Sequence, residues 1–180
     1  MKEKMKKELI EWVKAISITL VFAFVLTSFV RPTLVINDSM TNTFQEYDYL
    51  LVHRRAYTND LPEHGDVIIF QSHLPLDNGR GEKILIKRVI GLPGDFIRIT
   101  DGKVYRNGEE LIEPYIRDRT TNGEMDIIVP EDELFVMGDN RLGSQDSRHE
   151  SVGTVPMDAV LGKVFIRIFP FNKITTHFGA

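Results

Sequence analysis

Two charged side chains stand inside an apolar stretch of the chain that is typical of a β-strand. The stretch ILIKRVIGLPGD, from Ile84 to Asp95, places Lys87 and Arg88 among aliphatic residues. Side chains alternate between the two faces of a strand, so Leu85, Lys87 and Val89 share one face. Burial disfavours an ammonium group and lowers its pKa, which would make Lys87 a neutral amine able to act as a general base. The alternative is a lysine on an edge strand whose charged end reaches water.

A serine that such a lysine could activate stands in the segment VINDSMTNTF, residues 35–44. Ser39 follows an apolar stretch and lies among turn-forming residues. A turn would expose the hydroxyl, together with the backbone N–H groups that an oxyanion site requires. Serine–lysine pairs are a known variant of nucleophile–base catalysis. The alternative interpretation is a solvated serine in an ordinary turn.

A third segment, FVMGDNRLGSQDSR, residues 135–148, has the composition of a loop that follows a strand. Ser144 or Ser147 could offer a hydroxyl that orients the neutral lysine. Bidentate ion pairs could stiffen the loop through four charged residues, Asp139, Arg141, Asp146 and Arg148. An ordinary polar loop with weak surface ion pairs is the alternative.

The N-terminal region could hold these segments at a membrane. Lysines crowd the first 14 residues, whereas the 16 residues from Ala15 to Val30 carry no charge and Arg31 follows them. As a helix, this apolar run would rise about 24 Å, slightly less than the hydrocarbon core of about 30 Å. Lys14 and Arg31 can extend toward the headgroups, and Trp12 suits the interface. We therefore predict a cytoplasmic tail at 1–14, a transmembrane anchor at 15–31 and an extracytoplasmic domain at 32–180.

Two other interpretations of this apolar run are weaker. A cleavable signal peptide would have a shorter apolar region and an A-x-A site after it, and none follows here. A buried core helix would show a polar face, which this run lacks. With the anchor in place, Ser39 stands eight residues past Arg31, at most about 28 Å from the membrane surface. A nucleophile at that height suits a substrate that is itself held in the membrane.

The remainder of the chain is predicted to be mainly β. Short β-branched or aromatic segments alternate with Gly, Pro, Asn and Asp throughout this part of the sequence. Asp101-Gly102 and Asn107-Gly108 are two-residue hairpin signals that predict a meander from Phe96 to Ile112. We expect an antiparallel sandwich or partly open barrel. The polar stretch at about 102–125 is predicted to be a small cap-like excursion.

Composition and motifs exclude several classes of function. The net charge is −4 and the isoelectric point about 5.7, which argues against a nucleic-acid partner. Cysteine is absent, which removes disulfides and thiolate metal sites. The five histidines are scattered without a metal-binding motif, and no phosphate-binding loop or G-x-S-x-G segment occurs. We therefore expect no metal and no cofactor.

Taken in order, these segments resemble the type I signal peptidases, especially the single-anchor form of Gram-positive bacteria. The resemblance covers nearly the whole chain. Its two longest motifs are K-R-V-I-G-L-P-G-D at residues 87–95 and G-D-N-R-x-x-S-x-D-S-R at residues 138–148. It implies a membrane-bound serine endopeptidase that removes signal peptides from exported preproteins, with an antiparallel β catalytic domain, a smaller cap and no cofactor. It also implies a preference for small residues at the −1 and −3 positions of the substrate.

The resemblance assigns roles to matching positions. Ser39 would be the nucleophile, with its own N–H as an oxyanion donor, and Lys87 would be the general base. Ser144 would hydrogen-bond the lysine, and Arg88 would be structural. Three residues would hold the site together: Asp139, Asp146 and Arg148. An extended substrate could add a strand beside the segments leading into the dyad, where Ile36, Leu85 and Ile86 would line shallow apolar pockets or else pack in the core.

The nucleophile segment departs from the family pattern G-x-S-M-x-P-T. Asn37 replaces the glycine, which in some relatives is an oxyanion-donating serine, and Asn42 replaces the proline. Asparagine tolerates positive φ and its amide can donate, so Asn37 is a candidate second oxyanion donor. Asn42 would leave a less rigid turn than proline. Two alternatives to a signal peptidase remain. One is a non-catalytic pilus or secretion assembly factor that uses the same groove. The other is an autocleaving repressor with similar Ser-Lys chemistry, for which the chain offers a membrane anchor in place of a DNA-reading module.

Overall fold

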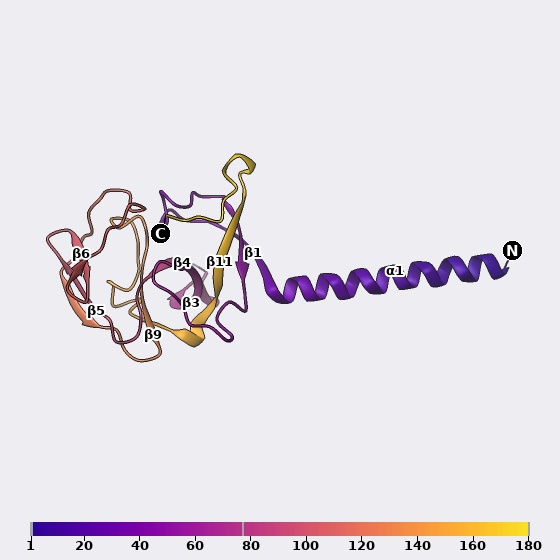
Figure 1. Ribbon diagram of the computed structural model, residues 1–180, viewed down its shortest axis with the longest axis horizontal. Coiled ribbons are helices and arrows are strands. Elements are labelled where there is room, and N and C mark those ends of the chain that lie inside the picture. The colour runs from indigo at the N-terminus through magenta and orange to yellow at the C-terminus, as the bar shows by residue number, and fades with distance from the viewer. Residues whose placement is uncertain (1, 77, 180) are drawn as a thin grey trace.

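A single long helix precedes a β domain and projects away from it (Figure 1). The computed structural model describes residues 2–76 and 78–179. Helix α1 (Lys2–Phe29) includes the lysine-rich segment as well as the apolar run. Its span Glu3–Phe29 is long and apolar enough to cross a membrane, and none of it is buried against the rest of the chain. The helix therefore fits a single-pass membrane anchor.

Seven antiparallel strands form the main sheet, in the spatial order β1-β2-β11-β3-β4-β9-β10. Strands β3 and β4 lie at its centre, and β4 carries the Lys87 segment. Two short 3₁₀ helices, η1 (Met157–Ala159) and η2 (Phe171–Lys173), flank β11. The strand bounds are β1 (Val30–Leu34), β2 (Tyr49–His53), β3 (Val67–Pro75), β4 (Glu82–Gly91), β9 (Glu133–Met137), β10 (Val155–Pro156) and β11 (Val160–Phe169).

A second, smaller sheet lies at the end of the domain farthest from α1 (Figure 1). This cap sheet has the order β7-β6-β5-β8, and the excursion expected at about 102–125 falls within its span. Both hairpin signals lie at its turns, because Asp101, Gly102, Asn107 and Gly108 all have positive φ, as the favoured hairpin turns require. Its strands are β5 (Phe96–Thr100), β6 (Lys103–Arg106), β7 (Glu109–Glu110) and β8 (Met125–Ile128).

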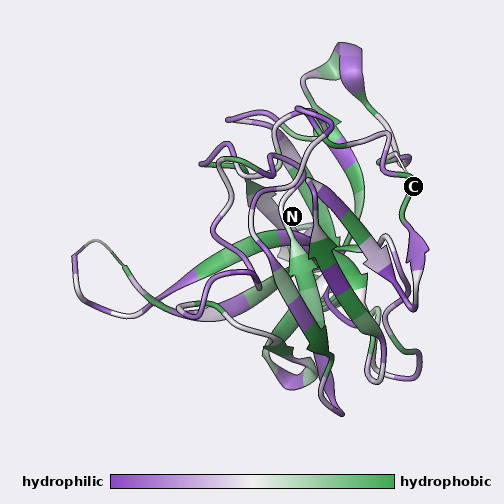
Figure 2. Cartoon of the chain, turned by 90° about the vertical axis from the view of Figure 1, so that its left-hand side faces the viewer, coloured by the Kyte–Doolittle hydropathy of each residue, from purple (hydrophilic) through white to green (hydrophobic). Residues whose placement is uncertain are grey.

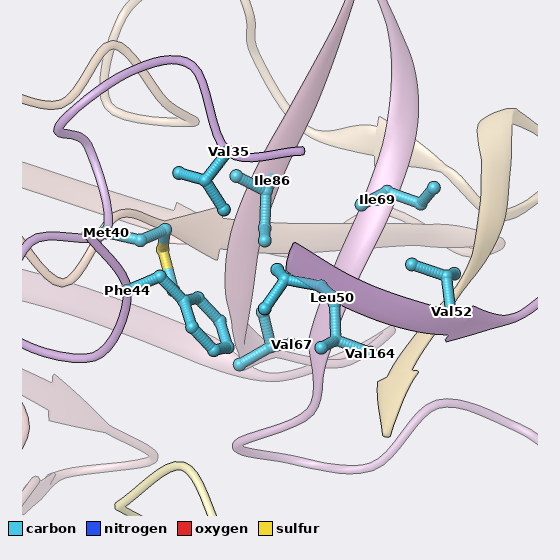
Figure 3. Packing of buried hydrophobic residues seen from close by; sticks show 9 residues of the cluster. All are labelled: Val35, Met40, Phe44, Leu50, Val52, Val67, Ile69, Ile86 and Val164. Atoms are coloured by element: carbon cyan, nitrogen blue, oxygen red, sulfur yellow. The ribbon is translucent and has the colours of Figure 1, made fainter. Parts of the chain in front are cut away.

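Hydrophobic residues gather on the strands that cross the middle of the domain, whereas the outer loops are largely hydrophilic (Figure 2). The buried residues form three clusters. One joins the nucleophile segment to the sheet and is shown in Figure 3: Val35, Met40, Phe44, Leu50, Val52, Val67, Ile69, Ile86 and Val164. A second surrounds Leu85 and Val89, and a third joins β4 and β9 to the cap sheet. The predicted fold, an apolar helix followed by an antiparallel β domain, is confirmed.

The helix passes into the sheet without a linker. Phe29 ends α1 and Val30 begins β1. The backbone N–H of Arg54 donates to the carbonyl of Phe29 at 2.9 Å, and the Arg54 side chain donates to that of Thr27 at 3.2 Å. The guanidinium of Arg55 lies over the Phe29 ring, 4.9 Å from its centroid. These contacts fasten the end of α1 to the loop after β2, and so hold the domain close to the end of the helix.

Candidate active site

Lys87 lies in the interior of β4, where only 1% of its surface is exposed. Its amine nitrogen lies 2.8 Å from Ser39 Oγ and donates to the carbonyl oxygen of Ile86 at 3.0 Å. The sequence separation of the dyad is 48 residues. The structure therefore brings together the two side chains that the sequence singled out as nucleophile and base.

Burial lowers the pKa of Lys87 from 10.5 to about 8. Desolvation is the largest cause, because removing water destabilises the ammonium form. The carboxylates of Asp146 and Asp139 oppose this effect, and their negative charge keeps the pKa from falling further. At mildly alkaline pH a substantial fraction of Lys87 is therefore unprotonated and can accept a proton.

Ser39 lies in a compact turn whose apolar side chains are buried against the main sheet. Its neighbour Met40 and the nearby Phe44 are fully buried in the first cluster, which fixes the turn on the sheet (Figure 3). The backbone N–H groups of Thr43 and Phe44 both donate to the carbonyl of Met40. The Ser39 carbonyl accepts the backbone N–H of Asn140 at 3.0 Å. Ser39 is thus held between the buried cluster and the loop after β9.

The amide oxygen of Asn37 faces Ser39. It accepts the Ser39 hydroxyl at 2.9 Å and the Ser39 backbone N–H at 3.3 Å. This arrangement differs from the expected one, in which the Asn37 amide nitrogen donates toward an oxyanion. Asn37 is also absent from the positive-φ residues of the chain, so the left-handed conformation invoked for this position is not used there.

The left-handed residue of this turn is Asn42, with a φ of 100°. Proline is confined to φ near −65°, so this backbone could not accommodate the proline of the family pattern. The Asn42 amide donates to the carbonyl of Tyr115 at 2.8 Å and ties the turn to the segment after the cap hairpins. With Asn42 in place of proline, the turn therefore has a conformation that proline could not adopt. The long-range hydrogen bond to Tyr115 stabilises it.

A buried ion pair supports the site from the residue next to the lysine. Arg88 donates from Nε and Nη2 to the two oxygens of Asp139, at 2.9 and 2.7 Å, and both side chains are fully buried. Arg88 also donates to the carbonyls of Gly65 and Phe178 and lies 3.9 Å from the Tyr115 ring centroid. These contacts are consistent with the structural role that the resemblance implies for Arg88.

The loop after β9 is held by a second bidentate pair. Arg148 donates from Nε and Nη2 to the two oxygens of Asp146, each at 2.8 Å. Asp146 also accepts the backbone N–H of Gly138 at 2.9 Å. Burial would raise the pKa of Asp146, but the hydrogen bonds and charge of Arg148 outweigh it and hold that pKa below its usual value. Asp146 is therefore an anion at any pH at which Lys87 loses its proton.

The two loop serines differ in their contacts. Ser147 accepts the backbone N–H of Val136 at 2.9 Å, which makes it part of the β9 scaffold. Ser144 is buried, and its hydroxyl forms no hydrogen bond of ordinary geometry among the described residues. It lies near enough to the Asp146 carboxylate to help lower the pKa of that group. The bond from Ser144 to the lysine that the resemblance implied is not formed here. The hydroxyl lies close to Gly138, where an added Cβ would meet Ser144 Oγ at 2.2 Å and the Ser39 carbonyl oxygen at 2.4 Å.

The three candidate pocket residues have unequal exposure. Ile36 has 72% of its surface exposed and is free to contact a substrate. Leu85 and Ile86 are buried, and they belong to two different apolar clusters. Core packing is therefore the observed role of Leu85 and Ile86. Ile36, by contrast, is an exposed apolar side chain three residues before Ser39.

Sequence reasoning missed several residues that hold the site. Glu113 accepts from both Nη atoms of the buried Arg141, which also donates to the Gly138 carbonyl at 3.1 Å. Thr43 donates to Asp139. Glu113 lies in the polar stretch that was assigned to the cap, and nothing in its local pattern marks it as buried. Among residues 2–76 and 78–179, no group of three or more His, Asp or Glu side chains is arranged to hold a metal ion.

Residues 9–169 match the family model described as signal peptidase, peptidase S26. The chain belongs to the signal peptidase family. It is 35% identical to the Signal peptidase I of Bacillus licheniformis over 94% of this chain and 93% of that relative. It is 30% identical to the Signal peptidase IB of Staphylococcus aureus over 97% of this chain and 96% of that relative.

Similar signal peptidases extend beyond these two genera. The Signal peptidase I of Leptolyngbya laminosa is 34% identical over 95% of this chain and 85% of that relative. A crystal structure of a signal peptidase I from Enterococcus faecalis covers 58% of this chain and 97% of the solved one, with 30% identity and a TM-score of 0.48. The near-complete coverage of the relatives includes the segments of Ser39, Lys87 and the loop after β9. This confirms the family inferred from those motifs.

Proposed function

We propose that Ser39 and Lys87 form the catalytic dyad of this signal peptidase. The observation that carries the proposal is the 2.8 Å contact between Lys87 Nζ and Ser39 Oγ. It joins a hydroxyl in an anchored turn to an amine that is almost completely removed from water and has a pKa near 8. A nucleophile and a base within hydrogen-bond reach satisfy the geometric requirement for covalent catalysis.

The reaction follows from these two groups. Neutral Lys87 takes the hydroxyl proton as Ser39 Oγ forms a bond to the scissile carbonyl carbon, and the Ser39 backbone N–H stabilises the resulting oxyanion. The lysine then gives this proton to the departing amine as the C–N bond breaks, which leaves an acyl-enzyme on Ser39. Lys87 next removes a proton from water, whose oxygen attacks the ester carbon. The lysine then returns this proton to Ser39 Oγ as the C–Oγ bond breaks, which releases the signal peptide and restores both residues. Asp139, Asp146, Arg148 and Ser144 hold the dyad rather than react.

The substrates of the family are signal-peptide preproteins. We propose that such a segment lies extended beside residues 32–38 and the start of β4, and adds its backbone hydrogen bonds to theirs. Alternate side chains of an extended peptide point the same way, which accounts for recognition at the −1 and −3 positions. The exposed Ile36 is the candidate apolar contact. Lipid is the second proposed partner, because the apolar span of α1 is not buried inside the rest of the protein.

The proposed topology places the N-terminus in the cytoplasm and residues 32–180 outside. The lysine-rich start of α1 supports this orientation, because positive flanks stay on the cytoplasmic side. The chain has no cysteine, so single cysteines can report topology directly. In intact cells, an impermeant maleimide should label Asn78→Cys and should label Lys7→Cys only after lysis. Labelling of Lys7→Cys in intact cells would contradict the orientation.

A preprotein cleavage assay tests the catalytic proposal. The full chain in detergent or vesicles should cleave a preprotein, and Ser39→Ala should reduce the rate to the uncatalysed background. Ser151→Ala is the matched control, because Ser151 is an exposed serine whose hydroxyl only accepts from Gln145. Equal processing by wild type and Ser39→Ala would refute the nucleophile. If neither processes the preprotein while both still bind it, the non-catalytic assembly role is favoured.

A further inference from the structure

The side chain of Asn37 occupies both hydrogen-bond donors of Ser39 that the proposed reaction needs. Its Oδ1 lies 2.9 Å from Ser39 Oγ and 3.3 Å from Ser39 N. The backbone N–H is the proposed oxyanion donor, and the hydroxyl is the proton source. An amide oxygen has two lone pairs, so one atom can accept both bonds. The Asn37 oxygen therefore lies where the scissile carbonyl oxygen would have to bind.

The direction of these bonds is fixed by chemistry. A backbone N–H can only donate, so the Asn37 atom facing it must be the oxygen and not the amide nitrogen. The Ser39 hydroxyl has a single hydrogen, which is directed at Asn37. Its oxygen accepts from Lys87 Nζ at 2.8 Å. In this arrangement the lysine donates to the serine, so proton transfer from Ser39 to Lys87 requires the hydroxyl to turn.

We propose that Asn37 is a displaceable plug that occupies the oxyanion position until a substrate carbonyl replaces it. The inference rests on the dyad proposed above. Asn37 is exposed, so its side chain can rotate into solvent without disturbing the core. The incoming carbonyl oxygen takes over the Ser39 N–H, and the freed hydroxyl turns its hydrogen to the lone pair of Lys87. The amide of Asn37 acts as an internal competitor that has the same functional group as the substrate.

Removing the plug should help the substrate to bind. Asn37→Ala keeps a residue compatible with the local backbone, because Asn37 does not have positive φ, and it eliminates the competing oxygen. In wild type, the apparent affinity for the substrate is lowered because Asn37 blocks a fraction of the sites. In Asn37→Ala no site is blocked in this way, so KM should fall and kcat should stay the same. We expect kcat/KM to rise about three- to tenfold, the factor that one hydrogen bond of ordinary net strength is worth.

A charged acceptor should have the opposite effect. Asn37→Asp preserves the acceptor and strengthens it, because hydrogen bonds to carboxylates are stronger than those to amides. KM should therefore rise. The added negative charge beside the dyad also favours the ammonium form of Lys87 and raises its pKa. The pH at which kcat/KM reaches half its maximum should move upward, which a purely structural change of the turn would not produce.

The experiment measures kcat and KM for preprotein cleavage by full-length wild type, Asn37→Ala, Asn37→Asp and Asn42→Gly across pH. Asn42→Gly is the matched control: it removes an amide from the same turn, and glycine adopts the φ of 100° found there, but Asn42 bonds Tyr115 and not Ser39. Only Asn37→Ala should show a lowered KM. The proposal is overturned if Asn37→Ala has kcat/KM equal to or below wild type, if Asn42→Gly lowers KM equally, or if Asn37→Asp leaves the pH midpoint unchanged. Loss of the dyad itself is read separately, from wild type against Ser39→Ala.

Discussion

Lys87 and Arg88 are adjacent in β4, yet each completes a different part of the site. Lys87 reaches Ser39, whereas Arg88 forms a bidentate pair with Asp139. Both are buried, but only Arg88 has a carboxylate directly against it. Successive strand residues point to opposite faces of the sheet. The same short segment therefore holds an amine without a carboxylate directly against it, which can lose its proton, and a guanidinium paired with a carboxylate, which stays charged. The two cations must therefore respond differently to pH and to substitution.

Cleavage should increase with pH as Lys87 loses its proton. The pKa of Lys87 is lowered to about 8 by burial, so kcat/KM should rise by about tenfold per pH unit at first and level off above that pKa. Initial rates of preprotein cleavage from pH 6 to 9.5 provide the measurement. Lys103→Met, which removes an exposed lysine of the cap sheet, should leave the profile unchanged. A flat wild-type profile would exclude a titrating lysine base.

Replacing the base should abolish activity and stabilise the fold. Lys87 has a pKa of about 8 when folded and 10.5 when unfolded. Between pH 8 and 10.5 the unfolded chain binds more protons than the folded one, so the free energy of unfolding rises with pH across this range. Below pH 8 the buried lysine is protonated in the folded state, and it destabilises the fold by its full amount. Lys87→Met should therefore unfold at higher temperature than wild type at pH 7, with a gain of about 3 kcal/mol that shrinks toward pH 10.5. Thermal unfolding in detergent at pH 7 and 10 measures the difference. A Lys87→Met protein less stable than wild type at pH 7 would contradict the assigned cost of burial.

Much of this architecture was predictable because its signals are local. Alternating apolar residues marked the strands, and Asp101-Gly102 and Asn107-Gly108 marked the hairpin turns at which the backbone adopts positive φ. The contact between Ser39 and Lys87 was also predictable, since a lysine within an apolar strand is unusual and a serine in a turn is a partner that it could activate.

Contacts that depend on tertiary packing could not be found in this way. Glu113 resembles any surface acid in the sequence, and only the docking of its segment onto Arg141 buries it. The orientation of Asn37 was missed for a related reason. An asparagine amide can donate or accept, and the choice depends on the Ser39 N–H that faces it.

The Arg88–Asp139 pair should be far more important to stability than a surface pair of the same geometry. Asp139→Asn leaves the fully buried Arg88 without its counter-charge, which should cost about 3–5 kcal/mol of unfolding free energy. Arg98 and Asp126 supply the matched control, because their bidentate contacts of 2.7 and 2.8 Å lie on the exposed cap sheet. Asp126→Asn should cost far less, because an ion pair in water contributes little to stability. Denaturant unfolding of both variants decides the matter, and equal losses would show that burial of the pair does not set its contribution.

Gly138, the first residue of the loop after β9, should be irreplaceable because it is packed against both Ser39 and Ser144. A Cβ at this position would approach Ser144 Oγ to 2.2 Å and the Ser39 backbone oxygen to 2.4 Å. One of them must move, and displacement of Ser39 by about 1 Å can cost on the order of a hundredfold in rate. We expect Gly138→Ala to lower kcat by at least about tenfold. Gly91→Ala is the control, because the atoms nearest to its Cβ would be side-chain atoms of Ile97 and Val129 at 3.0 Å. These belong to the cluster beneath the cap sheet and not to the Ser39 turn. If Gly138→Ala cleaves preprotein as fast as Gly91→Ala, the close approach of the loop to Ser39 is not needed for catalysis.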